Sequence, residues 1–320
     1  MKGRVEMRLA KRSDLPRVLE ICAATVAIMC EEGLHQWGDN YPLEADFVRD
    51  IERRELYVQE QGGAVLGFVC INRDQSPEYR LVDWKTGDGC LVLHRMAVAP
   101  EARRQGIGRR MIAFAEQMAF QQGVCFLRTD THSQNCRMNA LFAACGLERA
   151  GVVRFPNRDE DFYCYEKRIS SGELSETAAR LLLETAGYGV FCTASGDGEP
   201  YGVPVHFVYL EEEQELFFHC ALTGRKLQNI AENPRASVTA VTGCRILPAS
   251  YTTAYESVIA SGHAELVSDP EEKRRLLRLL CERFAPGQDR RDAVINKYLS
   301  SVAICRVELD SIHGKRSLGH

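Results

Sequence analysis

The sequence of 320 residues contains no apolar run close to the roughly 20 residues that a membrane-spanning helix needs. Its longest apolar stretches, such as residues 21–30, are too short. The first residues lead directly into mixed sequence and lack the apolar centre of a secretory signal peptide. We therefore expect a cytoplasmic protein that does not enter a membrane.

The sequence also lacks an excess of basic residues. It has 40 lysines and arginines against 44 aspartates and glutamates, which gives a formal net charge of −4. Nucleic-acid-binding domains usually carry a basic excess or a basic patch, so we expect no nucleic-acid partner. Local basic clusters remain able to bind small anions.

The motif Cys-x-x-Cys is absent, although the sequence has 13 cysteines. Zinc knuckles and thioredoxin-type redox sites need closely paired cysteines, so neither is expected and no metal site is predicted. An odd number of cysteines without a repeated spacing favours a reduced, cytosolic setting. In that setting most cysteines are small, buried apolar residues.

The length suits two domains of about 150 residues each. The best boundary is a short, polar, glycine-containing segment that follows a strand-like run and precedes a new helical pattern. We therefore predict a first domain over residues 1–169, a linker over 170–174 and a second domain over 175–320.

Helical and strand-like patterns alternate in the first domain. Strands are predicted at residues 56–58, 64–71, 91–98 and 125–130, and the second of these segments is apolar and β-branched. A helix is expected from residue 107 to the glycine at 123, and Asn135 can cap another that ends before Gly146. The alternation predicts an α/β domain with a mixed sheet and flanking helices.

The second domain is mainly β. Strands are expected at residues 188–194, 201–209, 215–220, 236–241, 255–266 and 302–309. One amphipathic helix is expected over residues 270–284. Closely spaced strands with few helices favour a small, closed antiparallel barrel.

A basic, glycine-containing loop joins the strand at 91–98 to the helix that follows it. Helix N-termini present unpaired backbone N–H groups and partial positive charge, and glycines let that backbone approach a pyrophosphate. The loop is no P-loop, because no Gly-Lys-Ser/Thr ends it. The alternative is a tight turn with a solvated arginine face.

The spacing Arg-x-x-Gly-x-Gly over residues 103–108 resembles motif A of the GNAT acetyltransferase superfamily. Further segments also resemble that family: the second motif at 127–135 and 138–147, and an acceptor-side segment at 34–37 and 40–42. The likeness covers roughly residues 5–169 and implies a GNAT fold.

The resemblance implies that acetyl-CoA is the acetyl donor and a small-molecule amine the acceptor. The implied cofactor-binding residues line a splay in the sheet, carry the pyrophosphate or touch the cofactor from the second motif: Met96, Ala97, Val98, Arg103, Arg104, Gln105, Gly106, Ile107, Gly108, Arg109 and Asn135. The amine must be neutral to attack the thioester, and a lysine-like amine with a pKa of about 10.4 is mostly protonated at pH 7. A general base should therefore assist.

Four residues are candidates for that base: His94, His132, Glu31 and Glu32. In an ideal strand His94 alternates with Met96 and Val98 and shares their face, although a packed strand residue is an equally good interpretation. His132 sits in a turn, where it is also placed to cap the next helix.

Many GNAT proteins place a tyrosine acid where this sequence has Phe142. The usual proton donor is therefore missing. Tyr163, Tyr165 or Cys145 are possible substitutes, or the thiolate leaves without a dedicated acid. A degenerate domain that binds acyl-CoA without turnover is the alternative.

In the second domain, an apolar strand ends at His219 and a loop delivers Thr223, Gly224, Arg225 and Lys226 to a helix start. Backbone donors, a hydroxyl and two cations make a plausible monophosphate site. A helix cap with two exposed basic residues explains the same run equally well.

The wider pattern resembles the pyridoxamine-phosphate-oxidase-like FMN-binding split barrels, and most closely the 5-nitroimidazole reductase subgroup. It comprises segments at 189–193, 200–207, 218–221, 224–226, 255–258 and 312–317. The resemblance implies an FMN-binding split β-barrel that forms a homodimer with the flavin between subunits. The implied flavin-contacting residues are Val203, Pro204, Val205, Phe218, His219, Cys220 and Ala221, with Arg225 and Lys226 on the phosphate.

His219 is then a candidate for the substrate side of the flavin, or a strand-end histidine bonded to a backbone carbonyl.

Together the resemblances imply an N-acetyltransferase fused to an FMN-dependent reductase or oxidase-like domain. Amines and nitro-aromatic molecules are candidate substrates, which suggests detoxification. The alternative is a barrel that holds flavin, or haem through His219, as a sensor or dimerisation module.

Overall fold

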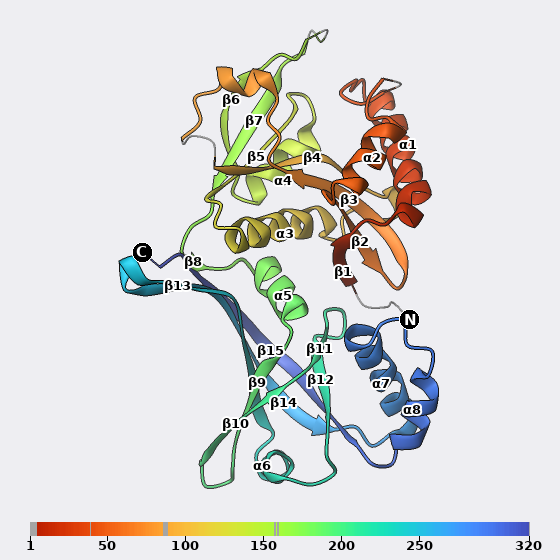
Figure 1. Ribbon diagram of the computed structural model, residues 1–320, viewed down its shortest axis with the longest axis vertical. Coiled ribbons are helices and arrows are strands. Elements are labelled where there is room, and N and C mark those ends of the chain that lie inside the picture. The colour runs from red at the N-terminus through yellow and green to blue at the C-terminus, as the bar shows by residue number, and fades with distance from the viewer. Residues whose placement is uncertain (1–4, 39, 86–88, 157, 159, 320) are drawn as a thin grey trace. The chain divides into compact units, whose positions relative to one another are not determined.

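The computed structural model describes residues 5–38, 40–85, 89–156, 158 and 160–319. Its internal contacts divide the chain into two compact units, Met1–Ser170 and Ser171–His320 (Figure 1). Each unit carries its own sheet, so each is described by itself.

The first unit contains a seven-stranded sheet in the order β1-β2-β3-β4-β5-β7-β6. Among the described residues, β4 and β5 are the only parallel neighbours, and the other pairs are antiparallel. The strands are β1 (Val5–Leu9), β2 (Leu56–Gln61), β3 (Ala64–Asn72), β4 (Cys90–Val98), β5 (Phe126–His132), β6 (Glu148–Val153) and β7 (Phe162–Arg168).

Helices cover both faces of this sheet (Figure 1). They are α1 (Leu15–Glu31), α2 (Glu44–Glu52), α3 (Ile107–Gln121) and α4 (Cys136–Ala144). Phe47 of α2 packs edge-on against Phe68 of β3, with ring centroids 5.2 Å apart. The preceding residue, Gly67, lies on the opposite face of the sheet, because a Cβ there would lie 2.7 Å from Cε of Met111 on α3. The predicted mixed α/β architecture is confirmed.

Strand β4 contains a bulge at Arg95, whose φ is +44°. Cys70 of β3 pairs with His94, but Phe68 pairs with Ala97, so β4 carries one extra residue between these pairs. His94 and Ala97 therefore share the α2 face of the sheet, while Met96 lies on the α3 face. The prediction that His94 shares a face with Met96 and Val98 is wrong, because one inserted residue reverses the alternation.

Strands β4 and β5 separate soon after they meet. Their pairing covers only Cys90–Val92 against Phe126–Arg128. At the next position the hydroxyl of Thr129 donates to the carbonyl oxygen of Leu93 at 3.0 Å. Beyond this point the described parts of the two strands do not pair, which opens the sheet at its centre.

The second unit is built on an antiparallel sheet with the strand order β10-β9-β13-β14-β15-β12-β11, and β8 pairs with β15. Its strands are β8 (Gly172–Glu173), β9 (Gly189–Ala194), β10 (Pro200–Val205), β11 (Val208–Leu210), β12 (Glu215–Cys220), β13 (Arg235–Leu247), β14 (Thr252–Leu266) and β15 (Ala303–Ser317). The helices are α5 (Glu176–Thr185), α6 (Arg225–Glu232), α7 (Pro270–Phe284) and α8 (Arg291–Tyr298).

The mainly β class of this unit is confirmed, and its sheet is consistent with a split barrel. No pairing among the described residues joins β10 to β11, so the sheet stays open where a closed barrel was expected. The strand predicted over residues 201–209 is two strands, because the chain leaves the sheet at His206 and Phe207. Phe207 and Tyr209 are nevertheless buried in the same core that Val203 and Val205 line.

Within the described chain, every helix falls short of the length and apolar character needed to cross a bilayer.

Candidate functional site

The loop before α3 presents a run of open backbone donors. Arg104 and Gly106 both have left-handed φ values, +63° and +80°. The first helical hydrogen bond of α3 runs from the Arg110 N–H to the Gly106 carbonyl. No backbone carbonyl of the described chain accepts from the N–H groups of residues 104–109. Six successive donors at a helix N-terminus form a cradle that suits a phosphate group.

Basic side chains surround this cradle. Nε of Arg103 is 3.4 Å from the Val98 carbonyl oxygen, which ties the loop to β4. Arg104 and Arg109 have no ion-pair partner within the part of the chain that the structure describes. At Gly108, a Cβ would lie 2.8 Å from Cδ2 of Leu141, so α3 and α4 approach closely here. The structure thus brings the predicted loop and the second motif together.

Asn135 caps α4, as its sequence position predicts. Its Oδ1 accepts from the Met138 N–H at 3.1 Å, and the residue is buried. Phe142, about two turns after Asn135 on α4, is buried against Tyr165, with ring centroids 5.2 Å apart. Phe142 thus serves as a core residue at the position where a tyrosine acid was missing.

The substitutes for that acid are engaged in other contacts. The Tyr165 hydroxyl donates to Oδ1 of Asn139 at 2.7 Å, and burial raises the pKa of Tyr165. Burial also raises the pKa of the Cys145 thiol. The guanidinium of Arg149 lies 4.7 Å from the centre of the Tyr163 ring.

Both candidate histidines have weakened basicity. Nε2 of His94 lies 3.0 Å from the carbonyl oxygen of Asp74, so this nitrogen donates the proton. Burial, with help from the charge of Arg95, lowers the pKa of His94 to about 4. Nδ1 of His132 accepts from the Gln134 N–H at 3.1 Å, and burial lowers the pKa of His132.

The two candidate glutamates lie on the surface at the end of α1. Glu31 and Glu32 are both exposed, and Glu32 forms an ion pair with Arg137 of α4.

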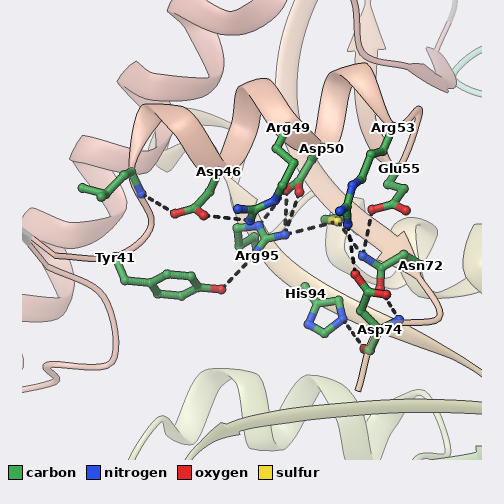
Figure 2. A network of polar contacts seen from close by, with 12 residues as sticks. Tyr41, Asp46, Arg49, Asp50, Arg53, Glu55, Asn72, Asp74, His94 and Arg95 are labelled. Carbon is green, nitrogen blue, oxygen red and sulfur yellow. Dashed lines mark hydrogen bonds and ion pairs between the residues drawn. The ribbon is translucent and has the colours of Figure 1, made fainter. Parts of the chain in front are cut away.

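A buried ion pair lies beside that opening on the α2 face (Figure 2). Nε and Nη2 of Arg95 donate to the two carboxylate oxygens of Asp50 at 2.8 and 2.9 Å. Nη1 of Arg95 donates to the Tyr41 hydroxyl at 3.0 Å. The bulge at Arg95 therefore directs a guanidinium into the sheet face where an alternating residue would not point.

Three potential metal ligands meet near this pair. Ligand atoms of Asp50, Glu55 and Cys70 lie within 4.8 Å of one another, the one such group found in the described chain. However, Asp50 is held by Arg95, and the amide of Asn72 donates to Glu55 at 2.9 Å. Burial raises the pKa of Cys70 to about 12, so it stays a thiol. Hydrogen bonds to Arg95 and Asn72 thus engage all three of these potential ligands.

Asp130 is a site residue that sequence reasoning missed. It lies on β5 just beyond the last pair with β4, and the Tyr79 hydroxyl donates to its Oδ1 at 2.6 Å. Burial raises its pKa to about 6, although Tyr79 opposes the shift. The available signal was an acidic residue within the second motif, on the strand that carries it.

In the second unit, the loop after β12 leads into α6. Phe218 is buried, Cys220 is half-buried, and His219 and Ala221 are exposed. Gly224 has a φ of +139°, which glycine adopts readily, and its carbonyl oxygen accepts from the Leu227 N–H at 3.0 Å.

The two predicted phosphate ligands begin α6. Lys226 has no ion-pair partner in the described chain. Arg225 lies 5.0 Å above the ring of Tyr201 on β10 and 3.6 Å from Glu199. The start of α6 therefore adjoins β10, on which Val203 and Val205 face the core and Pro204 is exposed. The structure brings these predicted residues to one region, and no carbonyl of the described chain accepts from the side chain of His219.

Comparisons with known proteins match the two units separately. Residues 24–147 match the family model of the acetyltransferase (GNAT) family. Residues 175–316 match that of pyridoxamine 5'-phosphate oxidase.

Individual relatives each cover about half of the chain. The uncharacterized N-acetyltransferase YhfO of Bacillus subtilis is 26% identical over 154 residues, 47% of this chain and 95% of the relative. A GNAT-family acetyltransferase structure from Streptococcus agalactiae is 20% identical, covers 51% of this chain and 95% of its own, and has a TM-score of 0.46. A candidate 5-nitroimidazole antibiotic resistance protein from Bacteroides thetaiotaomicron is 22% identical, with 46% and 87% coverage and a TM-score of 0.40.

Proposed function

Because this chain joins a GNAT-family acetyltransferase domain to a domain of the pyridoxamine 5'-phosphate oxidase family, we propose that it is an N-acetyltransferase of small amines fused to an FMN-dependent oxidoreductase. The observation that carries the acetyltransferase part is the run of open N–H groups over residues 104–109. This run of N–H groups follows β4, the strand that separates from its neighbour β5.

In the first domain, the donors of residues 104–109 and the side chains of Arg103, Arg104 and Arg109 hold the pyrophosphate of acetyl-CoA. The acetyl thioester then extends along Met96, Ala97 and Val98 toward the opening between β4 and β5. The amine nitrogen attacks the thioester carbon, a C–N bond forms and the C–S bond breaks. Since Phe142 has no proton to give, the sulfur leaves as a thiolate and takes its proton from solvent.

In the second domain, the fit to FMN rests on the start of α6. The Lys226 ammonium lacks an ion-pair partner in the described chain, and Arg225 is held only loosely by Glu199. Both are suited to a phosphate, and Val203, Pro204, Val205 and residues 218–221 border the ring system. A bound flavin would supply hydride or electron transfer, with His219 on the substrate side.

We propose that two copies of the second domain pair through an exposed sheet face. Val190, Thr239 and Ile259 stand in one row across β9, β13 and β14, and the two apolar members are 37% and 47% exposed. The variant Ile259→Glu should give a monomer in native mass spectrometry. Val294→Glu on α8 is the matched control, because Val294 is 49% exposed but lies outside this face.

The fusion suggests that both domains act on one class of molecule. A nitro-aromatic compound reduced to an amine would become an acceptor for the acetyltransferase, a cytoplasmic detoxification. A panel of nitro-aromatic compounds and aromatic amines tests this, and no response in either activity refutes it.

The second candidate function is a flavin- or haem-binding module. The absorption spectrum of the purified protein distinguishes the two ligands, because flavin gives a flavin spectrum and haem gives a Soret band.

Native mass spectrometry of the purified full chain tests the main proposal, with acetyl-CoA and FMN added. The variant R104A/R109A should raise the KM for acetyl-CoA at least tenfold, as expected for two lost charge-assisted contacts. R12A is its control, an exposed arginine paired only with Glu52. R225A/K226A should weaken FMN binding to a similar extent, with K297A on α8 as control. A chain that binds neither ligand refutes the proposal.

A further inference from the structure

Asp130 occupies a distinctive place at the opening between β4 and β5. The parallel register pairs Val92 with Arg128, and its continuation sets His94 opposite Asp130. Asp130 also pairs directly with Cys164 of β7, which belongs to the same buried cluster as Val92 and Tyr79. Asp130 and His94 therefore flank the opening on one face of the sheet.

One oxygen of Asp130 is held and the other is open. The Tyr79 hydroxyl donates to Oδ1, while Oδ2 has no hydrogen-bond partner within the described chain. Tyr79 is fully buried in the short 3-10 helix Pro77–Leu81, and Asp130 itself is half-buried. The arrangement fixes the carboxylate and leaves an acceptor atom beside the opening.

From this geometry we propose that Asp130 is the catalytic base that takes the proton of the acceptor amine, with Tyr79 as its positioning residue. The inference rests on the acetyl transfer proposed above. The ammonium form of the acceptor transfers one proton to Oδ2 of Asp130, and the neutral nitrogen attacks the thioester. The second N–H proton passes to solvent as the C–S bond breaks. The leaving thiolate takes one proton from solvent, and Asp130 releases its proton to solvent.

The charged and titratable groups around Asp130 agree with this role. They come from several elements: Tyr79, His94, Cys164, Tyr41 and Arg158. Burial raises the pKa of Asp130, while Tyr79 and Arg158 lower it, which leaves a pKa of about 6. A base of this strength is ionised at neutral pH and still accepts a proton readily. Tyr79 remains a donor, because burial and Asp130 raise its pKa well above 10.

The other candidates are less suited to this step. His94 has a pKa of about 4 and is therefore a weaker proton acceptor than Asp130. The Nδ1 lone pair of His132 is already occupied by the Gln134 N–H. Glu32 is paired with Arg137.

The test uses the full-length chain, acetyl-CoA and four amines: spermidine, phenethylamine, lysine methyl ester and aniline. kcat/KM for the best acceptor is measured from pH 5 to 9. For the wild type it should fall as the pH drops through about 6. D130N keeps an acceptor oxygen for Tyr79 but should lose roughly 100-fold or more in kcat/KM and lose this acidic limb. D161N is the control, since Asp161 is a partly exposed partner of Arg154.

Y79F distinguishes a positioned base from a structural carboxylate. Loss of the hydroxyl removes a bond that lowers the pKa of Asp130, so the acidic limb should move to higher pH while activity at pH 8 is largely kept. Carbon-13 NMR of the chain labelled at aspartate provides a readout without turnover. One carboxyl should titrate near pH 6, move upward in Y79F and be absent from D130N.

Failure of the role of Asp130 can be distinguished from failure of the proposed acetyl transfer. If the chain neither binds acetyl-CoA nor acetylates any amine, the proposed acetyl transfer fails and this inference with it. If the wild type is active and D130N matches its rate and pH profile, only this inference is overturned. A carboxyl that titrates near pH 4 and ignores Y79F also overturns it.

Discussion

The buried pair of Arg95 and Asp50 gives a sharp prediction about the stability of the first unit. The side chain of Asp50 is 2% exposed and that of Arg95 is 9% exposed. The variant Asp50→Asn keeps the shape of the side chain but removes its charge. The guanidinium of Arg95 would then be buried with the Tyr41 hydroxyl and a neutral amide as its partners.

Removing one partner of a buried ion pair costs about 3–5 kcal/mol, because the other charge stays desolvated without compensation. For a unit of this size, each kcal/mol lowers the melting temperature by about 2–4 °C. Asp50→Asn should therefore lower it by roughly 6–20 °C. The double variant Asp50→Leu/Arg95→Met removes both charges and should recover most of this loss.

Tryptophan emission measures this unit selectively in the full chain. The sequence has two tryptophans, Trp37 and Trp84, and both lie in the first unit. Arg49→Ala is the control, because Arg49 pairs with Asp46 at the surface and should cost less than about 1 kcal/mol. A loss below about 1 kcal/mol for Asp50→Asn, or a double variant less stable than the single one, would refute the reasoning.

Two further predictions concern packing and pH. Gly262→Ala places a Cβ 1.8 Å from the backbone oxygen of Glu308, so the second unit should lose about 3 kcal/mol or more of stability, seen by circular dichroism with an unchanged tryptophan transition. Gly187→Ala meets nothing within 4 Å and should be near neutral; equal effects of both variants would contradict the steric argument. His94 has a folded pKa of about 4, below the unfolded value of 6.5, so its unfolded form binds more protons between these values. Stability relative to His94→Gln should therefore fall by about 3 kcal/mol as the pH drops from 6.5 to 4, and parallel pH profiles in urea unfolding would exclude this.

Local patterns predicted those parts of the molecule whose structure is decided locally. The glycine loop before α3 and the Asn135 cap follow from residues that are adjacent in sequence. The face of His94 did not, because the bulge at Arg95 exists only through the pairing of β4 with β3. The sequence predicts one continuous strand over residues 201–209, because the alternation of apolar residues continues through the break. Phe207 lies between β10 and β11 and is still buried in the core.

The role of Asp130 was not predicted from the sequence for a related reason. Its position inside a strand is visible in the sequence, but the hydroxyl that holds it comes from Tyr79, 51 residues earlier. Its burial depends on the neighbouring strand β7 as well. A perturbed carboxyl is a property of the folded environment, and sequence separation hides such partners.

The opening between β4 and β5 gives the first unit two strand edges in the interior of a sheet. At the perimeter of a protein, unpaired edges invite pairing with other chains, which is a hazard for aggregation. Here the two edges lie between β3 and β7, inside the sheet and not at its margin. An extended molecule with amide groups of its own would complete the ladder as a strand does. In the described chain, three residue pairs join β4 to β5 across the middle of the sheet. The stability of the sheet at this place would then depend on the molecule that occupies the opening.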